Sequence, residues 1–163
     1  MNKFRTLLLC AVALVASYAC VPAFASSLYK GEKTLGVSGG FASYNKSAYT
    51  NVFFQYTFVP HVRIAPEIGY VIRNNDVSGF EVSCDMHFPF RLARGFNMYP
   101  LAGLTFNTWN NRVGDNYNRL GGDFGLGLEL YITGSLKLSL QGKYSLMKNT
   151  SGAFAGLSLG YVF

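Results

Sequence analysis

Ser83, Asp85 and His87 are the residues whose types could make a nucleophilic triad. They alternate along one extended segment, so all three side chains should point to the same side of a strand. Ser83 and His87 are four positions apart, which is roughly 13 Å in a strand, whereas a nucleophile and its base must lie within about 3 Å. The three residues therefore cannot form one triad, although another serine could approach His87 from a neighbouring strand.

The residues that commonly bind metals are few and scattered. The chain has two histidines, His61 and His87, and three cysteines, of which only Cys84 lies beyond the N-terminal segment. A structural zinc site needs about four such ligands at close spacing, so the sequence predicts no metal and no cofactor. Cys84 has no partner for an internal disulfide and is expected to act as a small apolar side chain.

The composition excludes two broad classes of protein. Half of the 163 residues are hydrophobic, 16% are aromatic and 13% are charged, which is incompatible with a disordered chain. The formal net charge is +6. The lysines and arginines form no run and no stripe, however, so nucleic acid is not an expected partner.

The N-terminal segment has the three parts of a secretory signal peptide. Residues 1–5 are positively charged, residues 7–19 are apolar, and Ala23-Phe24-Ala25 supplies small residues at the −3 and −1 positions of a cleavage site. We therefore expect a cleaved signal peptide, residues 1–25, followed by a mature domain, residues 26–163. An uncleaved membrane anchor and a lipoprotein remain as alternatives.

The mature domain has no second long apolar run, so any membrane crossing must be made by strands. It shows instead an alternation of apolar and polar residues, interrupted by turn residues. A tilted strand needs roughly 9–11 residues to cross an outer membrane. The eight segments of sufficient length are 34–43, 49–58, 62–73, 78–88, 96–108, 120–131, 135–147 and 152–163.

The alternation divides each segment into an apolar face and a polar face. In the fourth segment, for example, Phe80 and Val82 share one face, and Glu81 and Asp85 lie on the other. The fifth segment can be read with either parity. We take as its apolar face Met98, Ala102, Leu104 and Phe106.

Alternation alone does not say which face lies inside. A soluble antiparallel barrel buries its apolar face, whereas a membrane barrel turns that face to lipid and keeps polar groups inside. The polar face here is rich in glycine, which suits a narrow lumen, and aromatic residues gather near the strand ends, as in interfacial girdles. These aromatic residues are Tyr49, Phe58, Tyr70, Phe80, Phe88, Phe96, Phe106, Trp109, Tyr144, Tyr161 and Phe163.

The sequence therefore predicts an all-β fold, an eight-stranded antiparallel up-and-down transmembrane β-barrel. A soluble ligand-binding barrel or sandwich with an aromatic core remains the alternative. The two differ in the direction of the apolar face, which a structure decides.

Ten ionisable side chains fall on the predicted inward face. A catalytic or ion-conducting centre is one interpretation, but charges in so narrow a lumen need partners in any case. The positive and negative charges are nearly balanced in number, which favours an interior charge network with no catalytic or ion-conducting role. The residues are Arg63, Glu67, Arg73, Glu81, Asp85, His87, Asp123, Glu129, Lys137 and Lys143.

The sixth and seventh segments also predict a strand register. Residues 132–134 fit a three-residue hairpin turn in which Gly134 adopts a left-handed conformation. This register pairs Glu129 with Lys137 inside the barrel. The other pairs that it implies are Asp123–Lys143 inside, and Leu130–Leu136, Leu128–Leu138, Leu126–Leu140 and Phe124–Gly142 outside.

With both termini in the periplasm, the outward links are 44–48, 74–77, 109–119 and 148–151. The third is the longest and the best candidate for recognition, because Asn, Arg, Tyr and Trp supply hydrogen bonds and aromatic contact area. An ordinary polar loop is the plainer interpretation. Its candidate residues are Trp109, Asn110, Asn111, Arg112, Asp115, Asn116, Tyr117 and Arg119. The rim cations that could neutralise lipopolysaccharide phosphates are Lys46, Arg112, Arg119 and Lys148.

The chain ends on Tyr161-Val162-Phe163, with Leu157 and Leu159 alternating before it. With the signal and the eight alternating strands, this ending resembles the small OmpA/OmpX-like outer-membrane barrels of Gram-negative bacteria. In that family an aromatic last residue belongs to the signal that the barrel-assembly machinery reads, and Tyr161 and Phe163 match it. The resemblance implies Sec export to the outer membrane, contact with lipid and lipopolysaccharide, and a monomer with a packed polar interior.

The family does not imply one activity, since its members include structural anchors, adhesins, host-surface binders and lipid A enzymes. The barrel-type lipid A 3-O-deacylases carry a His-x-Ser pair, but here His61 precedes Val62-Arg63 and His87 precedes Phe88-Pro89. We therefore expect a non-enzymatic, non-conducting barrel that is envelope-structural or adhesin-like, with an extracellular ligand or host surface as a further partner. An outer-leaflet lipid A-modifying enzyme is the alternative.

Overall fold

The structure of the protein is a computed structural model, which describes residues 29–74, 76–111, 116–148 and 151–163. The predicted signal peptide lies outside these residues. Across the described ranges, no helix is long and apolar enough to span a membrane. The strands are β1 (Lys33–Ala42), β2 (Ser47–Val59), β3 (Val62–Asn74), β4 (Val77–His87), β5 (Phe90–Ala93), β6 (Phe96–Asn111), β7 (Tyr117–Thr133), β8 (Leu136–Met147) and β9 (Gly152–Val162).

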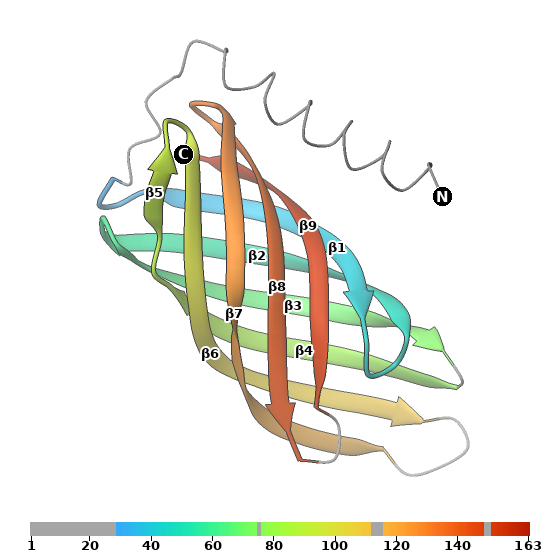
Figure 1. Cartoon of the computed structure of the whole chain (residues 1–163). Coiled ribbons are helices and arrows are strands. Elements are labelled where there is room, and N and C mark those ends of the chain that lie inside the picture. Colours follow the sequence, from blue (N-terminus) through green and yellow to red (C-terminus); the bar gives the residue numbers. More distant parts are fainter. Residues whose placement is uncertain (1–28, 75, 112–115, 149–150) are drawn as a thin grey trace, which may run out of the picture.

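These strands form one antiparallel sheet that closes on itself (Figure 1). Their order is β4-β3-β2-β1-β9-β8-β7-β6-β5, and a further pairing of β4 with β6 completes the ring. β5 pairs with β6 after β4 has ended, so β4 and β5 together make one of the eight barrel strands. The predicted eight-stranded up-and-down barrel is confirmed.

The break between β4 and β5 follows from Pro89, which has no N–H to donate to a neighbouring strand. Phe88 still donates its backbone N–H to the Pro100 carbonyl oxygen at 2.9 Å. Regular pairing with β6 resumes where Phe90 lies opposite Met98. The proline therefore interrupts the fourth barrel strand locally and leaves the ring closed.

The first and last strands meet at one end of the barrel. Lys33 and Phe163 exchange two backbone hydrogen bonds, of 3.4 and 3.0 Å, and Figure 1 shows the C-terminus near the start of β1. We term this the proximal end, and it also carries the short turns at 60–61, 94–95 and 134–135. The opposite end, where the described link residues 43–46, 76, 116, 148 and 151 lie, is the distal end.

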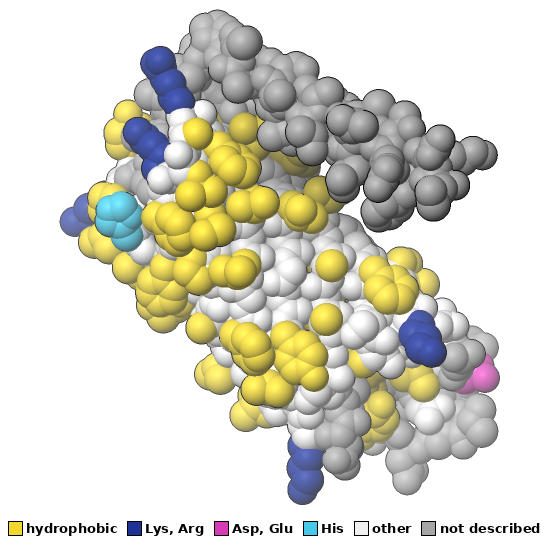
Figure 2. Space-filling model, in the orientation of Figure 1, with side chains coloured by type: hydrophobic (Ala, Val, Ile, Leu, Met, Phe, Trp, Pro, Cys, Tyr) yellow, Lys and Arg dark blue, Asp and Glu magenta, His cyan; other side chains and the backbone are white. Residues whose placement is uncertain are grey.

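Polar side chains face the lumen and apolar side chains face outward. Arg63 and Lys137 are each 1% exposed, whereas Leu104 and Leu120 are 65% and 70% exposed. Figure 2 shows hydrophobic side chains spread over the barrel wall, with lysines and arginines near its two ends. A water-soluble barrel would have the opposite polarity. The soluble alternative is therefore wrong, and the barrel is a transmembrane one.

The fifth predicted segment corresponds to β6, and its apolar side chains lie on the face that we predicted. Ala102, Leu104 and Phe106 are exposed on the outer face and Met98 is half-buried there, while Tyr99 is buried in the lumen. The alternation of residue types therefore identified the lipid face even in the segment where it was weakest.

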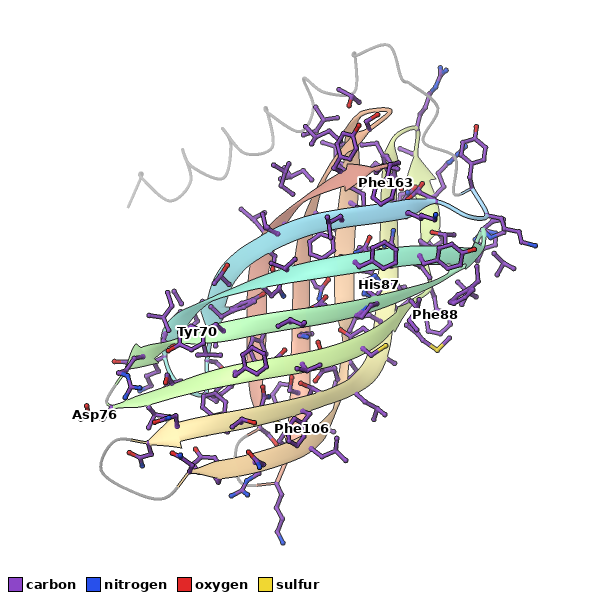
Figure 3. All side chains as sticks on the ribbon, turned by 180° about the vertical axis from the view of Figure 1, so that it is seen from behind. Tyr70, Asp76, His87, Phe88, Phe106 and Phe163 are labelled. Atoms are coloured by element: carbon purple, nitrogen blue, oxygen red, sulfur yellow. The ribbon has the colours of Figure 1, made fainter. Side chains whose placement is uncertain are left out.

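Aromatic side chains lie near both ends of the outer surface. Figure 3 shows Phe88 and Phe163 towards the proximal end, and Tyr70 and Phe106 towards the distal end. The prediction of an interfacial girdle position is wrong for Tyr49 and Trp109. Both side chains point into the lumen and are 9% and 1% exposed.

The register between β7 and β8 differs by two residues from the predicted one. Leu130 lies opposite Leu138 and not Leu136, and Leu128 lies opposite Leu140. A shift of two residues keeps every side chain on its predicted face. The pairs across the strands change, while the division into lumen and lipid faces does not.

The cause of this shift is the turn between the two strands. It spans 134–135, one residue fewer than predicted, and Gly134 is not among the residues with a positive φ. The extra length is taken up by an irregularity between Tyr131 and Thr133, just before the turn. The predicted left-handed glycine is therefore wrong.

β1 and β9 close the barrel along a seam of small inward-facing residues. A Cβ on Gly40 would overlap the carbonyl oxygen of Ala155 and lie 2.5 Å from the Cα of Gly156. The two backbones approach so closely that only glycine fits between them. The inward-facing pairs along the seam are Gly36–Gly160, Ser38–Ser158 and Gly40–Gly156.

Candidate functional site in the barrel lumen

An ion cluster fills the proximal part of the lumen. Glu129 on β7 accepts a hydrogen bond from Arg63 Nη2 on β3 at 2.9 Å and one from Asn97 Nδ2 at 3.0 Å. Lys137 Nζ on β8 lies 3.7 Å from Glu129 Oε2 and 3.6 Å from Glu32 Oε1. We term Arg63, Glu129, Lys137 and Glu32 the proximal cluster, and its two cations balance its two carboxylates.

Tyr99 and His87 lie beside the proximal cluster. The His87 ring stacks on the Tyr99 ring with centroids 4.6 Å apart, and the Arg63 guanidinium lies 5.1 Å from the centre of the same ring. The Tyr99 hydroxyl donates to Gln141 Oε1 at 3.0 Å. This ring has room because Gly127 on β7 lies against it, and a Cβ there would overlap the ring atoms.

A second ion cluster occupies the middle of the lumen around Lys143 on β8. Its Nζ lies 3.1 Å from Asp123, 3.2 Å from Glu81, 3.4 Å from Glu67 and 3.6 Å from Asp85. We term these five residues the middle cluster. It sets one cation against four carboxylates, so its charges do not balance.

An apolar cluster closes the distal end of the lumen. Trp109 is 1% exposed, and the Tyr44 ring packs edge-on against it with centroids 4.7 Å apart. Tyr44 and Tyr49 both pack against Phe154, at 5.1 and 5.2 Å between centroids. Gly79 makes space for the indole, since a Cβ there would lie 2.6 Å from Trp109 Cζ3. We term Tyr44, Tyr49, Trp109 and Phe154 the distal plug.

The Tyr44 side chain joins the plug from a turn. Tyr44 lies in the turn between β1 and β2, and its buried hydroxyl has no hydrogen-bond partner. Burial raises the pKa of this hydroxyl above its ordinary value. The side chain is therefore a neutral, apolar part of the closure.

The structure brings together most of the predicted inward charges. The middle cluster contains five of them, and Arg63, Glu129 and Lys137 meet in the proximal cluster, with His87 between. Arg73 is placed elsewhere: it donates to the Asp76 carbonyl oxygen and to Ser78 Oγ, at 3.0 and 3.1 Å, near the distal end.

Two lumen residues, Glu32 and Tyr99, were missed from the sequence. Glu32 precedes the first predicted strand, yet it accepts a hydrogen bond from the Tyr131 hydroxyl at 2.8 Å and contacts Lys137. Tyr99 was hidden by the ambiguous parity of its segment. Glu32 lies two residues before Thr34, so the period of the strand could have placed its side chain on the inward face.

Ser83, Asp85 and His87 do not assemble into a triad. Lys143 Nζ donates to Ser83 Oγ at 3.3 Å, while His87 Nδ1 faces Arg63 Nη2 at 3.3 Å. Among the described residues, no hydrogen bond joins a hydroxyl or thiol to His87. The contacts of these three residues are therefore not those of a nucleophile activated by a base.

The predicted recognition loop is shorter than the sequence indicated. β6 continues to Asn111, and β7 begins at Tyr117. Trp109 pairs with Tyr117 as part of the barrel wall. The assignment of Trp109 to an open loop is therefore wrong. Arg119 stacks over Tyr117 at 4.7 Å. Asn111 donates its N–H to Asn116 Oδ1 at 3.1 Å, Asn110 is exposed, and Arg112 and Asp115 lie outside the described residues.

Glu129 holds two buried cations at once, and this arrangement predicts a non-additive effect. We expect Glu129→Gln to destabilise the barrel by about 3–5 kcal/mol, because Arg63 and Lys137 lose their shared carboxylate. Adding Lys137→Met removes one orphaned cation, so the double variant should be more stable than Glu129→Gln alone. Urea unfolding in detergent micelles compares the wild type, Glu129→Gln, Lys137→Met and the double variant, and simply additive losses would refute the shared pairing.

Comparison with known proteins relates this barrel to solved structures. No family model and no curated protein matches the sequence. The N-terminal β-barrel domain of Pseudomonas aeruginosa OprF superposes with a TM-score of 0.73 at 19% identity, over 82% of this chain and 98% of that one.

Two further barrels show the same fold. Ail, the attachment invasion locus protein of Yersinia pestis, superposes with a TM-score of 0.61 at 16% identity, over 83% of this chain and 100% of Ail. Neisserial surface protein A gives 0.64 at 14%, over 83% and 98%. The predicted resemblance is confirmed at the level of the fold, and the chain has the architecture of the small eight-stranded outer-membrane β-barrels.

Proposed function

We propose that this protein is an outer-membrane barrel of a Gram-negative envelope that conducts no ions, catalyses no reaction and acts through its presence in the membrane and its distal rim. The observation that carries the proposal is the filling of the lumen by the proximal cluster, the middle cluster and the distal plug. A lumen cavity lined by Asn51, Gln55, Glu67 and Gln141 has a volume of only ≈ 10 Å³. That is room for about one water molecule.

The filled lumen predicts the absence of a stable open channel. Purified barrel reconstituted in planar lipid bilayers should give no reproducible conductance steps, because an eight-stranded barrel holds its own side chains and little else. A large porin purified in the same detergent serves as the positive control. Reproducible large openings from the monomer would overturn the proposal.

The route to the membrane is also part of the proposal. Residues 1–25 are removed as a Sec signal peptide, and the last strand, with Tyr161 and Phe163, is read by the barrel-assembly machinery. Both rings face outward, at 58% and 61% exposure, and stack with centroids 6.4 Å apart. Such exposed aromatic side chains at the proximal end suit a contact with a folding factor or with the inner lipid interface. The barrel is a monomer.

The distal rim supports the surface-binding part of the proposal. Among its described residues, Lys46 and Lys148 are exposed, Arg73 and Arg119 are half-buried, and Asp76 is the acidic counterpart. Ail, which shares the fold at 15% identity, has a structure in complex with the heparin analogue sucrose octasulfate. The excess of cations suits a phosphate- or sulfate-bearing polyanion, such as lipopolysaccharide or a sulfated glycan of a host surface.

Intact cells allow this rim to be tested separately from the proximal end. Replacing both Lys46 and Lys148 with glutamine should weaken binding of fluorescent heparin to cells by roughly 2–30-fold, since each exposed ion contact contributes about 0.2–1 kcal/mol. The matched control replaces Lys30 and Lys33, which are exposed at the proximal end, and should leave binding unchanged. Equal losses from both pairs would contradict the assignment of the distal rim.

A further inference from the structure

Within the described part of the lumen, the charge deficit lies in the middle cluster. The proximal cluster pairs two cations with two carboxylates, whereas Lys143 is the one cation among the described residues that contacts Glu67, Glu81, Asp85 and Asp123. All five side chains are at most 8% exposed. Uncompensated charges inside a barrel wall are strongly unfavourable, so the middle cluster requires additional positive charge.

Three side chains beside this deficit place their ligand atoms together. One carboxylate oxygen each from Glu67 and Asp85 and a ring nitrogen of His87 all lie within 4.8 Å of one another. Asp85 and His87 alternate along β4, and Glu67 reaches them from β3. The small, fully buried Ala65 lies directly opposite Asp85 in the pairing of β3 with β4.

Two of these groups are buried without hydrogen-bond partners. Asp85 and His87 are both 0% exposed. Among the described residues, neither carboxylate oxygen of Asp85 has a hydrogen-bond partner, and His87 Nε2 has none either. Buried polar groups of this kind are costly unless something binds them, and here they share one position in the lumen.

We propose that Glu67, Asp85 and His87 bind a divalent transition-metal ion inside the barrel. One imidazole with two carboxylates is a donor set for Zn²⁺, Mn²⁺ or Fe²⁺, whereas Mg²⁺ and Ca²⁺ prefer oxygen ligands throughout. Ligand atoms about 2.1 Å from a metal lie at most about 4.2 Å apart. In a tetrahedral site the ligand atoms lie roughly 3.4 Å apart, so the most distant pair must approach by up to about 1.4 Å, which rotations of the carboxylate and imidazole groups can supply.

Lys143 and Arg63 can give up their contacts with the proposed ligands, because each has a shorter contact with another carboxylate. Lys143 Nζ is nearest to Asp123 and Glu81, at 3.1 and 3.2 Å, and its longer contacts are to the two proposed carboxylate ligands. A bound divalent ion would thus take Glu67 and Asp85 while Lys143 kept its two shortest ion pairs. The net charge of the middle cluster would change from −3 to −1, because the ion adds two positive charges.

His87 can change partners in the same way. With Nδ1 accepting from Arg63 at 3.3 Å, the ring proton lies on Nε2, where it has no acceptor. Coordination through Nε2 moves the proton to Nδ1 and breaks the contact with Arg63. That guanidinium nitrogen keeps its shorter bond to Glu129, at 2.9 Å.

The ion should enter while the barrel folds, since the proximal cluster and the distal plug close both ends of the lumen. The test uses barrel purified in detergent, unfolded in urea with chelator, and refolded with ZnCl₂, MnCl₂ or CoCl₂. After desalting, elemental analysis should find about one ion per folded barrel, retained against EDTA. Wild-type barrel that refolds in every one of these salts and carries no ion would overturn the proposal, and protons would then supply the missing charge.

Variants separate this site from adventitious binding at the surface. Asp85→Asn and His87→Asn should each lower the metal content at least tenfold, while His61→Ala, which removes the exposed histidine of the proximal turn, should leave it unchanged. Heat-modifiability gels select the folded barrel for each variant. The Co²⁺ form supplies a second readout, because its visible absorption bands should disappear in His87→Asn. Unchanged metal content or spectrum in folded Asp85→Asn and His87→Asn would refute the assignment.

Discussion

Replacing Lys143 with methionine is expected to destabilise the barrel by about 3–5 kcal/mol or to prevent it from folding. The change removes the cation that, in the described part of the chain, contacts all four carboxylates of the middle cluster. Urea unfolding followed by circular dichroism of the strands in detergent measures the loss. The matched control is Lys33→Met, at an exposed position of the proximal end, which should change stability by less than about 0.5 kcal/mol.

A second substitution tests whether charge is the cause. Asp123 is the carboxylate nearest to Lys143, at 3.1 Å, so Asp123→Asn added to Lys143→Met should restore part of the lost stability by removing one unpaired charge. Lost packing of the lysine stem would not be restored in this way. If Lys143→Met were as stable as Lys33→Met, the middle cluster would have no electrostatic role in the fold.

The seam between β1 and β9 predicts a contrast between two adjacent glycines. Gly40→Ala should cost at least about 1–3 kcal/mol and reduce the yield of folded barrel, because the added Cβ meets the backbone of β9 and no side chain can move aside. Gly39 faces outward, and a Cβ there would have one neighbour, the Tyr49 carbonyl oxygen at 3.6 Å. Gly39→Ala should therefore be neutral or stabilising by up to about 1 kcal/mol.

Heat-modifiability gels on refolded samples measure the folded fraction of both variants. The two substitutions add the same methyl group to neighbouring residues of one strand, so differences in intrinsic strand propensity cancel. Equal yields of Gly40→Ala and Gly39→Ala would contradict the close approach of the first and last strands.

The sequence predicted the strands and their faces because both depend on local information. Alternation with a period of two residues is set by the pleat of a strand, and a lipid-facing wall repeats it in every segment. The β7–β8 register depended instead on a turn, and Gly134 suits both a three-residue and a two-residue connection. A slip of two residues preserves the alternation, so the pattern contained nothing to exclude it.

The lumen was harder to predict because its contacts join strands that are not neighbours. Arg63 and Glu129 belong to β3 and β7 and are 66 residues apart in the sequence. A nearly balanced total of inward charges concealed an uneven distribution, since Arg73 lies near the distal end and Glu32 adds a carboxylate at the proximal one. For the same reason, counting histidines and cysteines could not reveal the proposed ligand set, which includes Glu67 and Asp85.

Trp109 was predicted as part of a solvent-facing loop because its neighbours are polar. Asn110 and Asn111 follow it directly, and short polar runs are typical of loops. The pairing of β6 with β7 continues through this polar stretch. The space left by Gly79 then allows a large ring to turn inward, a tertiary effect that local composition cannot show.

Trp109 is the only tryptophan among the 163 residues, and it lies within the distal plug. Fluorescence excited at wavelengths that tyrosine does not absorb therefore originates from this one buried indole at one end of the lumen. In refolding experiments this emission reports the moment at which the distal plug packs, whereas circular dichroism reports the formation of strands throughout the wall. The chain thus contains a site-specific optical probe of its own assembly, without any attached label.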